Sequence, residues 1–97
     1  MKNIRISQLI NDKNNPANNQ FVVETNKGKF FQSYDTLICF WDGNNIVLSE
    51  DWDYSKTTSK HLYIFIRDFT PYSVYNRKDV LKAIKDNKFK VVEKLSF

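Results

Sequence analysis

Residues 21–41, FVVETNKGKFFQSYDTLICFW, decide the fold. Two runs rich in β-branched and aromatic residues flank a turn at 26–28 whose glycine can adopt a positive φ, so the pattern predicts a hairpin. The segment 37–41 has apolar residues on both faces, which is typical of a central strand. Polar residues at 42–45 then form a turn into IVLS. We therefore predict an antiparallel meander over residues 20–49.

The residues before the meander predict one strand and one loop. In KNIRISQLI (2–10), Ile4 and Ile6 alternate with polar neighbours, which favours a short strand at or near the edge of the sheet over a helix. The segment NDKNNPANN (11–19) is rich in asparagine and contains Pro16. Such a composition cannot build a core, so we expect a mobile loop there.

After the meander, the hydrophobic period changes from two to 3.6. One helical stripe is formed by Leu62, Phe65, Ile66 and Phe69. Because this stripe is apolar, the helix should pack on the sheet, and Pro71 should end it.

A second helix is predicted to begin after Asn76, a good N-cap, and to continue through RKDVLKAIKD (77–86). The residues expected to face inward are Val80, Leu81 and Ile84. Asn87 can adopt the left-handed conformation that ends a helix. The last segment, FKVVEKLSF (89–97), alternates again and predicts a final strand.

The element order is thus β-ββββ-αα-β. It predicts an α+β fold with a mostly antiparallel sheet of about five to six strands and two helices packed on it. With 97 residues, 41% hydrophobic and 15% aromatic, the chain can build one core, so we expect a single domain over residues 1–97 and exclude a two-domain enzyme.

Composition also indicates the cellular compartment in which the protein is expected. Cys39 is the one cysteine and stands in an apolar run, so we expect a buried, inert thiol and a reducing compartment. A membrane-spanning helix needs about 18 consecutive apolar residues, and no apolar run in the sequence is close to that length. The N-terminus also lacks the apolar core of a signal peptide. We expect a protein of the bacterial cytoplasm that does not bind membranes.

The stretch DWDYSKTTSK (51–60) alternates acids and aromatics before a run of hydroxyl residues. It matches the first half of a calcium loop, but Lys56 and Leu62 stand where that loop needs glycine and glutamate. We instead expect Ser55, Thr57 and Thr58 to satisfy backbone N–H groups at the start of the first helix. No metal site is predicted.

Catalytic patterns are missing from the sequence. His61 is the one histidine and has no nucleophile or acid in a recognisable relation to it, so we interpret it as a surface or half-buried helix residue. With two glycines in the chain, phosphate-binding loops are excluded. We expect neither enzymatic activity nor a cofactor.

The net charge of +4 is carried by residues 70–97. Helical spacing places Lys78, Lys82 and Lys85 on one face. Either this is a solvated helix face, or it contacts nucleic acid, with exposed aromatic residues among Tyr72, Tyr75 and Phe89 stacking on bases. The candidate nucleic-acid-binding residues are Arg77, Lys78, Lys82, Lys85, Lys88 and Lys90.

Two segments, KFFQSYDTLICFW and WDYSKTTSKHLYIFI, resemble a family of small uncharacterised proteins encoded by phages, plasmids and other mobile elements. That family shows an F-x-S-Y-D-T strand motif followed by W-D-Y-S-x-T-T before a helix. The likeness covers residues 21–69, and the matching positions are Phe31, Ser33, Tyr34, Asp35, Thr36, Trp52, Asp53, Tyr54, Ser55, Thr57 and Thr58. The resemblance implies an accessory protein of a mobile element, of a size often used to inhibit host machinery, and no catalytic set.

The shared polar and aromatic residues have two interpretations. The residues Ser33–Thr36 can lock the strand to the helix start by hydrogen bonds to Asp53, Tyr54 and Thr57. Alternatively they form an interface, because such groups are common in binding hot spots. The candidate partner-binding residues are Tyr34, Asp35, Trp52, Asp53 and Tyr54.

We therefore expect a non-enzymatic module that binds a protein or nucleoprotein partner, with a host defence complex among the candidates. Direct nucleic-acid binding is the alternative. The edge strand also leaves a homodimer open as a hypothesis.

Overall fold

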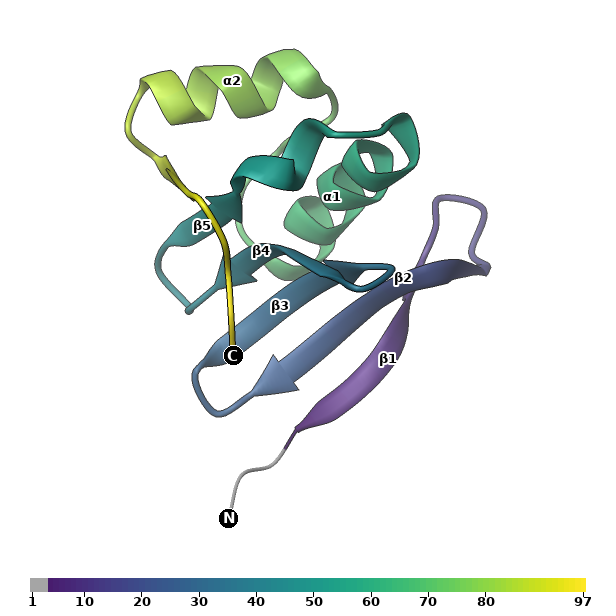
Figure 1. Ribbon diagram of the computed structural model, residues 1–97. Helices are drawn as coiled ribbons and strands as arrows, with labels where there is room; N and C mark the ends of the chain where they lie inside the picture. Colours follow the sequence, from purple (N-terminus) through teal and green to yellow (C-terminus); the bar gives the residue numbers. More distant parts are fainter. Residues whose placement is uncertain (1–3) are drawn as a thin grey trace.

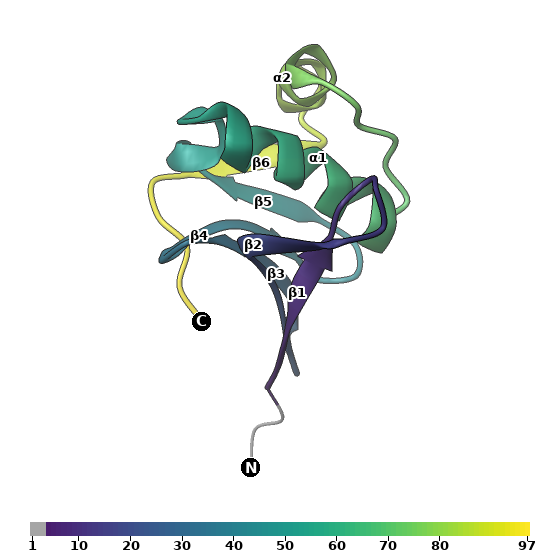
Figure 2. The same cartoon turned by 90° about the vertical axis from the view of Figure 1, so that its right-hand side faces the viewer.

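The computed structural model describes residues 4–97. Six strands form one sheet in the order β1-β2-β3-β4-β5-β6, with both helices on one face (Figures 1 and 2). The elements are β1 (Arg5–Ile10), β2 (Pro16–Thr25), β3 (Gly28–Ser33), β4 (Thr36–Trp41), β5 (Ile46–Ser49), a 3-10 helix η1 (Glu50–Asp53), α1 (Lys56–Phe69), α2 (Arg77–Lys85) and β6 (Phe89–Val92). The predicted α+β class and element order are confirmed.

The meander forms as its turn chemistry predicts. β2 and β3 are joined by a two-residue turn before Gly28, which has a φ of 149°. β3 and β4 are joined by a turn in which Tyr34 has a φ of 54°, a conformation that few residues with a side chain adopt. β6 returns after the two helices and pairs with β5 in parallel, whereas the other strand pairs are antiparallel.

The main core lies between α1 and the sheet. Leu62, Phe65 and Ile66 of α1 are fully buried, and the ring of Phe65 stacks on that of Phe31 in β3 at 5.7 Å between centroids. Cys39 is also fully buried, as predicted, and burial raises the pKa of its thiol far above the ordinary value.

Three expectations need correction. Leu81 of α2 is 40% exposed, because α2 turns Val80, Ala83 and Ile84 toward the core and so points the residue after Val80 outward. The loop expected over 11–19 covers only 11–15, since Pro16 opens β2; proline is tolerated at the first residue of a strand. β6 ends at Val92 rather than continuing to the C-terminus.

The face of the sheet opposite the helices, called here the far face, is also apolar. Paired residues on neighbouring strands point to the same face, so the register aligns Ile6, Val23, Phe30, Phe40 and Val47 in one row. The rings of Phe30 and Phe40 are 4.4 Å apart. Residues 93–97 run down this side of the sheet (Figure 2), where the ring of Phe97 lies 5.0 Å from that of Phe30.

The turn between β4 and β5 gives a prediction about pH. The Asp42 carboxylate accepts hydrogen bonds from the backbone N–H groups of Asn44 and Asn45, which lower its pKa. A lowered pKa means that this stabilisation is present above the ordinary carboxyl range and is lost as the pH falls through the folded-state pKa. Asp42→Ala should therefore destabilise the protein at pH 7, and the difference from wild type should shrink in acid. Urea unfolding across pH measures this, and a difference that stays constant would contradict it.

The chain's two glycines offer a matched test of the first turn. A Cβ on Gly28 would lie 2.2 Å from the carbonyl oxygen of Trp41, whereas a Cβ on Gly43 meets no atom within 4 Å. Gly28→Ala should cost about 2–4 kcal/mol of unfolding free energy through the clash and the strained φ, and Gly43→Ala about 1 kcal/mol through its φ alone. Urea denaturation of both variants tests this, and equal losses would refute it.

Candidate functional site

The start of α1 is tied to the sheet by a group of hydroxyls. Ser55 is the N-cap of α1, and its hydroxyl accepts a hydrogen bond from the backbone N–H of Thr58. The Thr58 hydroxyl lies 3.1 Å from that of Ser55 and 3.0 Å from that of Ser33 on β3, and Ser33 and Thr58 are buried. The predicted capping is thus confirmed for Ser55, whereas the Thr58 hydroxyl contacts other hydroxyls and not a backbone N–H group. The lock between strand and helix start exists, but it joins Ser33 to Thr58 rather than to Asp53, Tyr54 or Thr57.

Trp52 is one of the candidate partner-binding residues, but it is buried. It lies in η1 with 6% of its surface exposed, as part of the main core. Ser49 caps η1 by accepting a hydrogen bond from the backbone N–H of Asp51. The tight turn of η1 points Trp52 inward and leaves Asp51 and Tyr54 outside.

The other four candidate partner-binding residues do not form one patch. Tyr34 (49% exposed) and Asp35 occupy the turn between β3 and β4. Asp35 lines a hollow beside the C-terminal segment, whereas Asp53 and Tyr54 line a different one. The two pairs face different hollows because one pair lies in a turn between strands and the other lies just before α1.

A hollow at Tyr54 is lined by tyrosine and charged side chains, and we call it the tyrosine groove. It has a volume of about 600 Å³ and lies between the start of α1 and the residues that lead into α2. Its lining comprises Asp53, Tyr54, Ser55, Lys56, Ser59, Lys60, Tyr63, Tyr75 and Arg77. Tyr54 and Tyr75 are 68% and 67% exposed. The groove therefore presents two large amphipathic side chains to solvent.

Contacts between elements hold the wall formed by Tyr75. Arg67 of α1 donates to the carbonyl oxygen of Val74, and its guanidinium lies 4.6 Å from the centroid of the Tyr75 ring. The backbone N–H of Tyr75 donates to the Asp79 carboxylate in α2. The segment before α2 is thereby fixed against α1, which positions Tyr75 opposite the helix start.

The groove has a basic character with one internal ion pair. Arg77 pairs with Asp53, so the positive charge of the lining comes from Lys56 and Lys60, both exposed. Partial burial raises the pKa of Tyr63; the Ser59 hydroxyl opposes this rise, while the Asp53 carboxylate adds to it. Tyr63 therefore keeps its phenolic proton near neutral pH and can donate a hydrogen bond.

Sequence reasoning missed the groove as a unit. Tyr63 stands beside the apolar stripe of α1, and Tyr75 was considered only as a base-stacking residue. No spacing in the sequence indicates that residues near 54, 63 and 75 meet, because their proximity depends on how the segment before α2 lies against α1. Nearby, His61 is half-buried, as expected, with its Nδ1 2.7 Å from the carbonyl oxygen of Thr57.

The six candidate nucleic-acid-binding residues also do not share one face. Lys90 pairs in register with Val47, so it points to the far face, away from α2. Arg77 is paired with Asp53, and Lys82 with Asp86, while Lys78, Lys85 and Lys88 are exposed. Of the expected stacking residues, Phe89 is buried and Tyr72 packs edge-on against it, which leaves Tyr75.

Within residues 4–97, no group of three His, Cys, Asp or Glu side chains is placed to hold a metal ion. Over the same residues, no helix is long and apolar enough to cross a membrane.

The sheet, the two helices and the groove define a small α+β protein with an exposed tyrosine-lined surface. By sequence, the chain belongs to a family of unknown function (DUF8033), whose model matches residues 4–87. This confirms that the chain belongs to an uncharacterised family, whereas the mobile-element origin and the two motifs stay predictions. No curated protein and no solved structure matches the chain.

The hydroxyl group at the helix start generates a testable prediction. Thr58→Val keeps the side-chain shape but removes the hydroxyl, so the buried Ser33 hydroxyl loses its partner. We expect a loss of about 1–3 kcal/mol in unfolding free energy. Thr57→Val is the matched control, because Thr57 is exposed and should cost less than about 0.5 kcal/mol. Chemical denaturation compares the two, and similar losses would show that the lock contributes little.

Proposed function

We propose that this protein is a non-enzymatic binding module that engages a protein or nucleoprotein partner through the tyrosine groove. One observation carries the proposal: tyrosines from three separate segments line one open hollow together with basic side chains. Tyrosine and arginine dominate binding hot spots, because they offer large contact areas and hydrogen bonds at low cost in side-chain entropy.

The shape of the groove favours a macromolecule over a small ligand. Small-molecule sites are enclosed and mostly apolar, whereas the two outer tyrosines here project into solvent. Lys56 and Lys60 beside them favour a partner with acidic side chains. The resemblance to proteins of mobile elements supports action in a bacterial cytoplasm, with a host defence complex as a candidate target.

Direct nucleic-acid binding is the second candidate function. It is supported by the exposed lysines Lys78 and Lys85 on α2, which are free to contact phosphates. It is weakened by Lys90 on the far face and by the ion pairs of Arg77 and Lys82. We therefore favour binding of a protein surface in the tyrosine groove over direct nucleic-acid binding.

A display selection tests the groove without knowledge of the natural partner. Peptides that bind the wild-type protein are selected from a random library. Their affinities are then measured for the wild type and for the double variant that combines Tyr54→Ala with Tyr75→Ala. We expect acidic peptides to be enriched and to bind the double variant about 10–100-fold more weakly. Tyr34→Asn is the control, since Tyr34 is exposed outside the groove and asparagine tolerates its positive φ. Peptides that bind the double variant unchanged would refute the proposal.

Fluorescence anisotropy with labelled single- and double-stranded DNA and RNA separates the two candidates. If the protein binds a protein surface, no salt-dependent nucleic-acid binding should appear at low salt. Micromolar binding that Lys78→Glu, Lys82→Glu and Lys85→Glu together abolish would instead establish the nucleic-acid function.

A further inference from the structure

The two edges of the sheet differ in how well they are protected against pairing. Proteins commonly blunt exposed edges with short strands and lysines. β6 follows this rule, because it has four residues, contains Lys90 and is flanked by Lys88 and Lys94. β1 has six residues and one charge, Arg5. No strand among residues 4–97 pairs with the outer side of β1.

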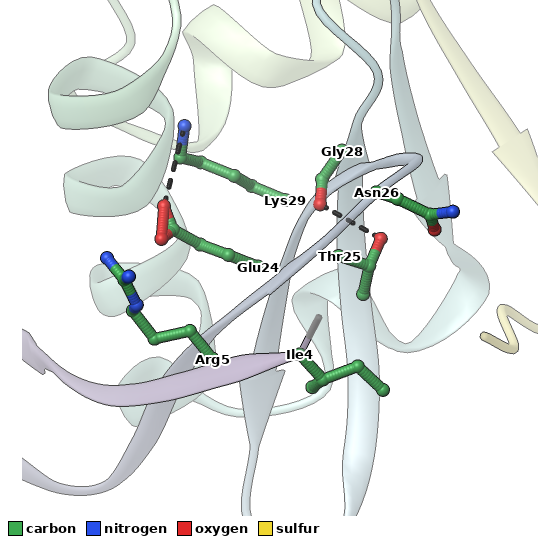
Figure 3. Close-up of a pocket in the computed structure, with 7 residues that line it drawn as sticks. All are labelled: Ile4, Arg5, Glu24, Thr25, Asn26, Gly28 and Lys29. Atoms are coloured by element: carbon green, nitrogen blue, oxygen red, sulfur yellow. Dashed lines mark hydrogen bonds and ion pairs between the residues drawn. The ribbon is translucent and has the colours of Figure 1, made fainter. Parts of the chain in front are cut away.

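β1 also exposes apolar side chains. Ile4, Ile6 and Ile10 are 54%, 64% and 44% exposed. Ile6 is in register with Val23 and so ends the apolar row of the far face at an open edge. In Figure 3, Ile4 points away from the side on which Arg5, Glu24 and Lys29 lie. The apolar row thus ends at exposed side chains of β1, which a further strand beside β1 would cover.

The charges next to β1 select the direction of a further strand. Arg5 begins β1, and Asp12 follows shortly after its end. In an antiparallel pair of identical strands, the start of each strand meets the end of the other. Arg5 of one copy therefore approaches Asp12 of the other, whose carboxylate also accepts a hydrogen bond from Arg67 of its own copy. A parallel pair would align like charges. Glu24, the neighbour of Arg5 on β2, already pairs with Lys29 (Figure 3), which leaves Arg5 without an ion pair among the described residues.

From these observations we infer that β1 pairs with β1 of a second copy of this chain, antiparallel across a two-fold axis, and joins the two sheets into one. Exposed backbone groups of both edges would be satisfied, and the isoleucines of the two strands would cover one another. Because only one strand from each copy takes part, the contact falls at or below about 1,200 Å², and we expect dissociation in the micromolar range.

Sedimentation velocity of the full chain over about 5–500 µM tests the pairing. The mass should rise from 11.6 kDa toward twice that value as concentration increases. Ile6→Lys places a charge on the edge at an exposed position and should weaken the dimer at least about tenfold. The matched control is Leu81→Lys, another exposed aliphatic residue, on α2, which should leave the dimer intact.

Hydrogen exchange at the same concentrations identifies the surface that pairs. Amides of β1 should exchange more slowly as the dimer forms, whereas those of β6 should not change. A monomer at every concentration would overturn the inference and would leave β1 open to an extended segment of a different protein. A dimer that tolerates Ile6→Lys, or that protects another element instead of β1, would overturn it as well.

Discussion

The packing of the apolar stripe of α1 on the sheet is the interaction on which the other features depend. An isolated helix of 14 residues is marginal in water, so α1 persists because Leu62, Phe65 and Ile66 are buried against the strands. Burial of each such side chain contributes about 1.5–3 kcal/mol. The hydroxyl contacts at Ser55, Thr58 and Ser33 then fix where the helix begins. Both walls of the tyrosine groove are in turn positioned by α1.

Most of the fold could be predicted from the sequence because its determinants are local. The turn at 26–28, the stripe of α1, the Asn76 cap and the positive φ of Asn87 each act within a few residues. The errors arise where tertiary contacts decide. Leu81 is apolar like Val80 and Ile84, and only the orientation of α2 exposes it. The C-terminal segment alternates like a strand, yet beyond Val92 it leaves the sheet edge and packs Phe97 on Phe30.

The candidate site could be predicted only in part, for a related reason. Of the candidate partner-binding residues in this segment, Tyr54 is exposed and Asp53 is half-buried, but Trp52 beside them is buried. A run that alternates polar and aromatic residues predicts alternating exposure without saying which side is inside. The groove needs Tyr63 and Tyr75 in addition, and these meet Tyr54 through the contacts of Arg67 and Arg77 with segments distant in sequence.

Arg67 also connects the two surfaces proposed here. Its guanidinium donates to the Asp12 carboxylate just beyond β1, and it packs on the Tyr75 ring at the groove. In the antiparallel dimer, Arg5 of the second copy approaches the same carboxylate, so Asp12 would share its charge between two arginines. Arg67 therefore contacts both the turn that follows β1 and the Tyr75 wall of the groove. Because pairing at β1 leaves the groove open on each copy, each dimer would present two grooves to a partner with repeated surfaces.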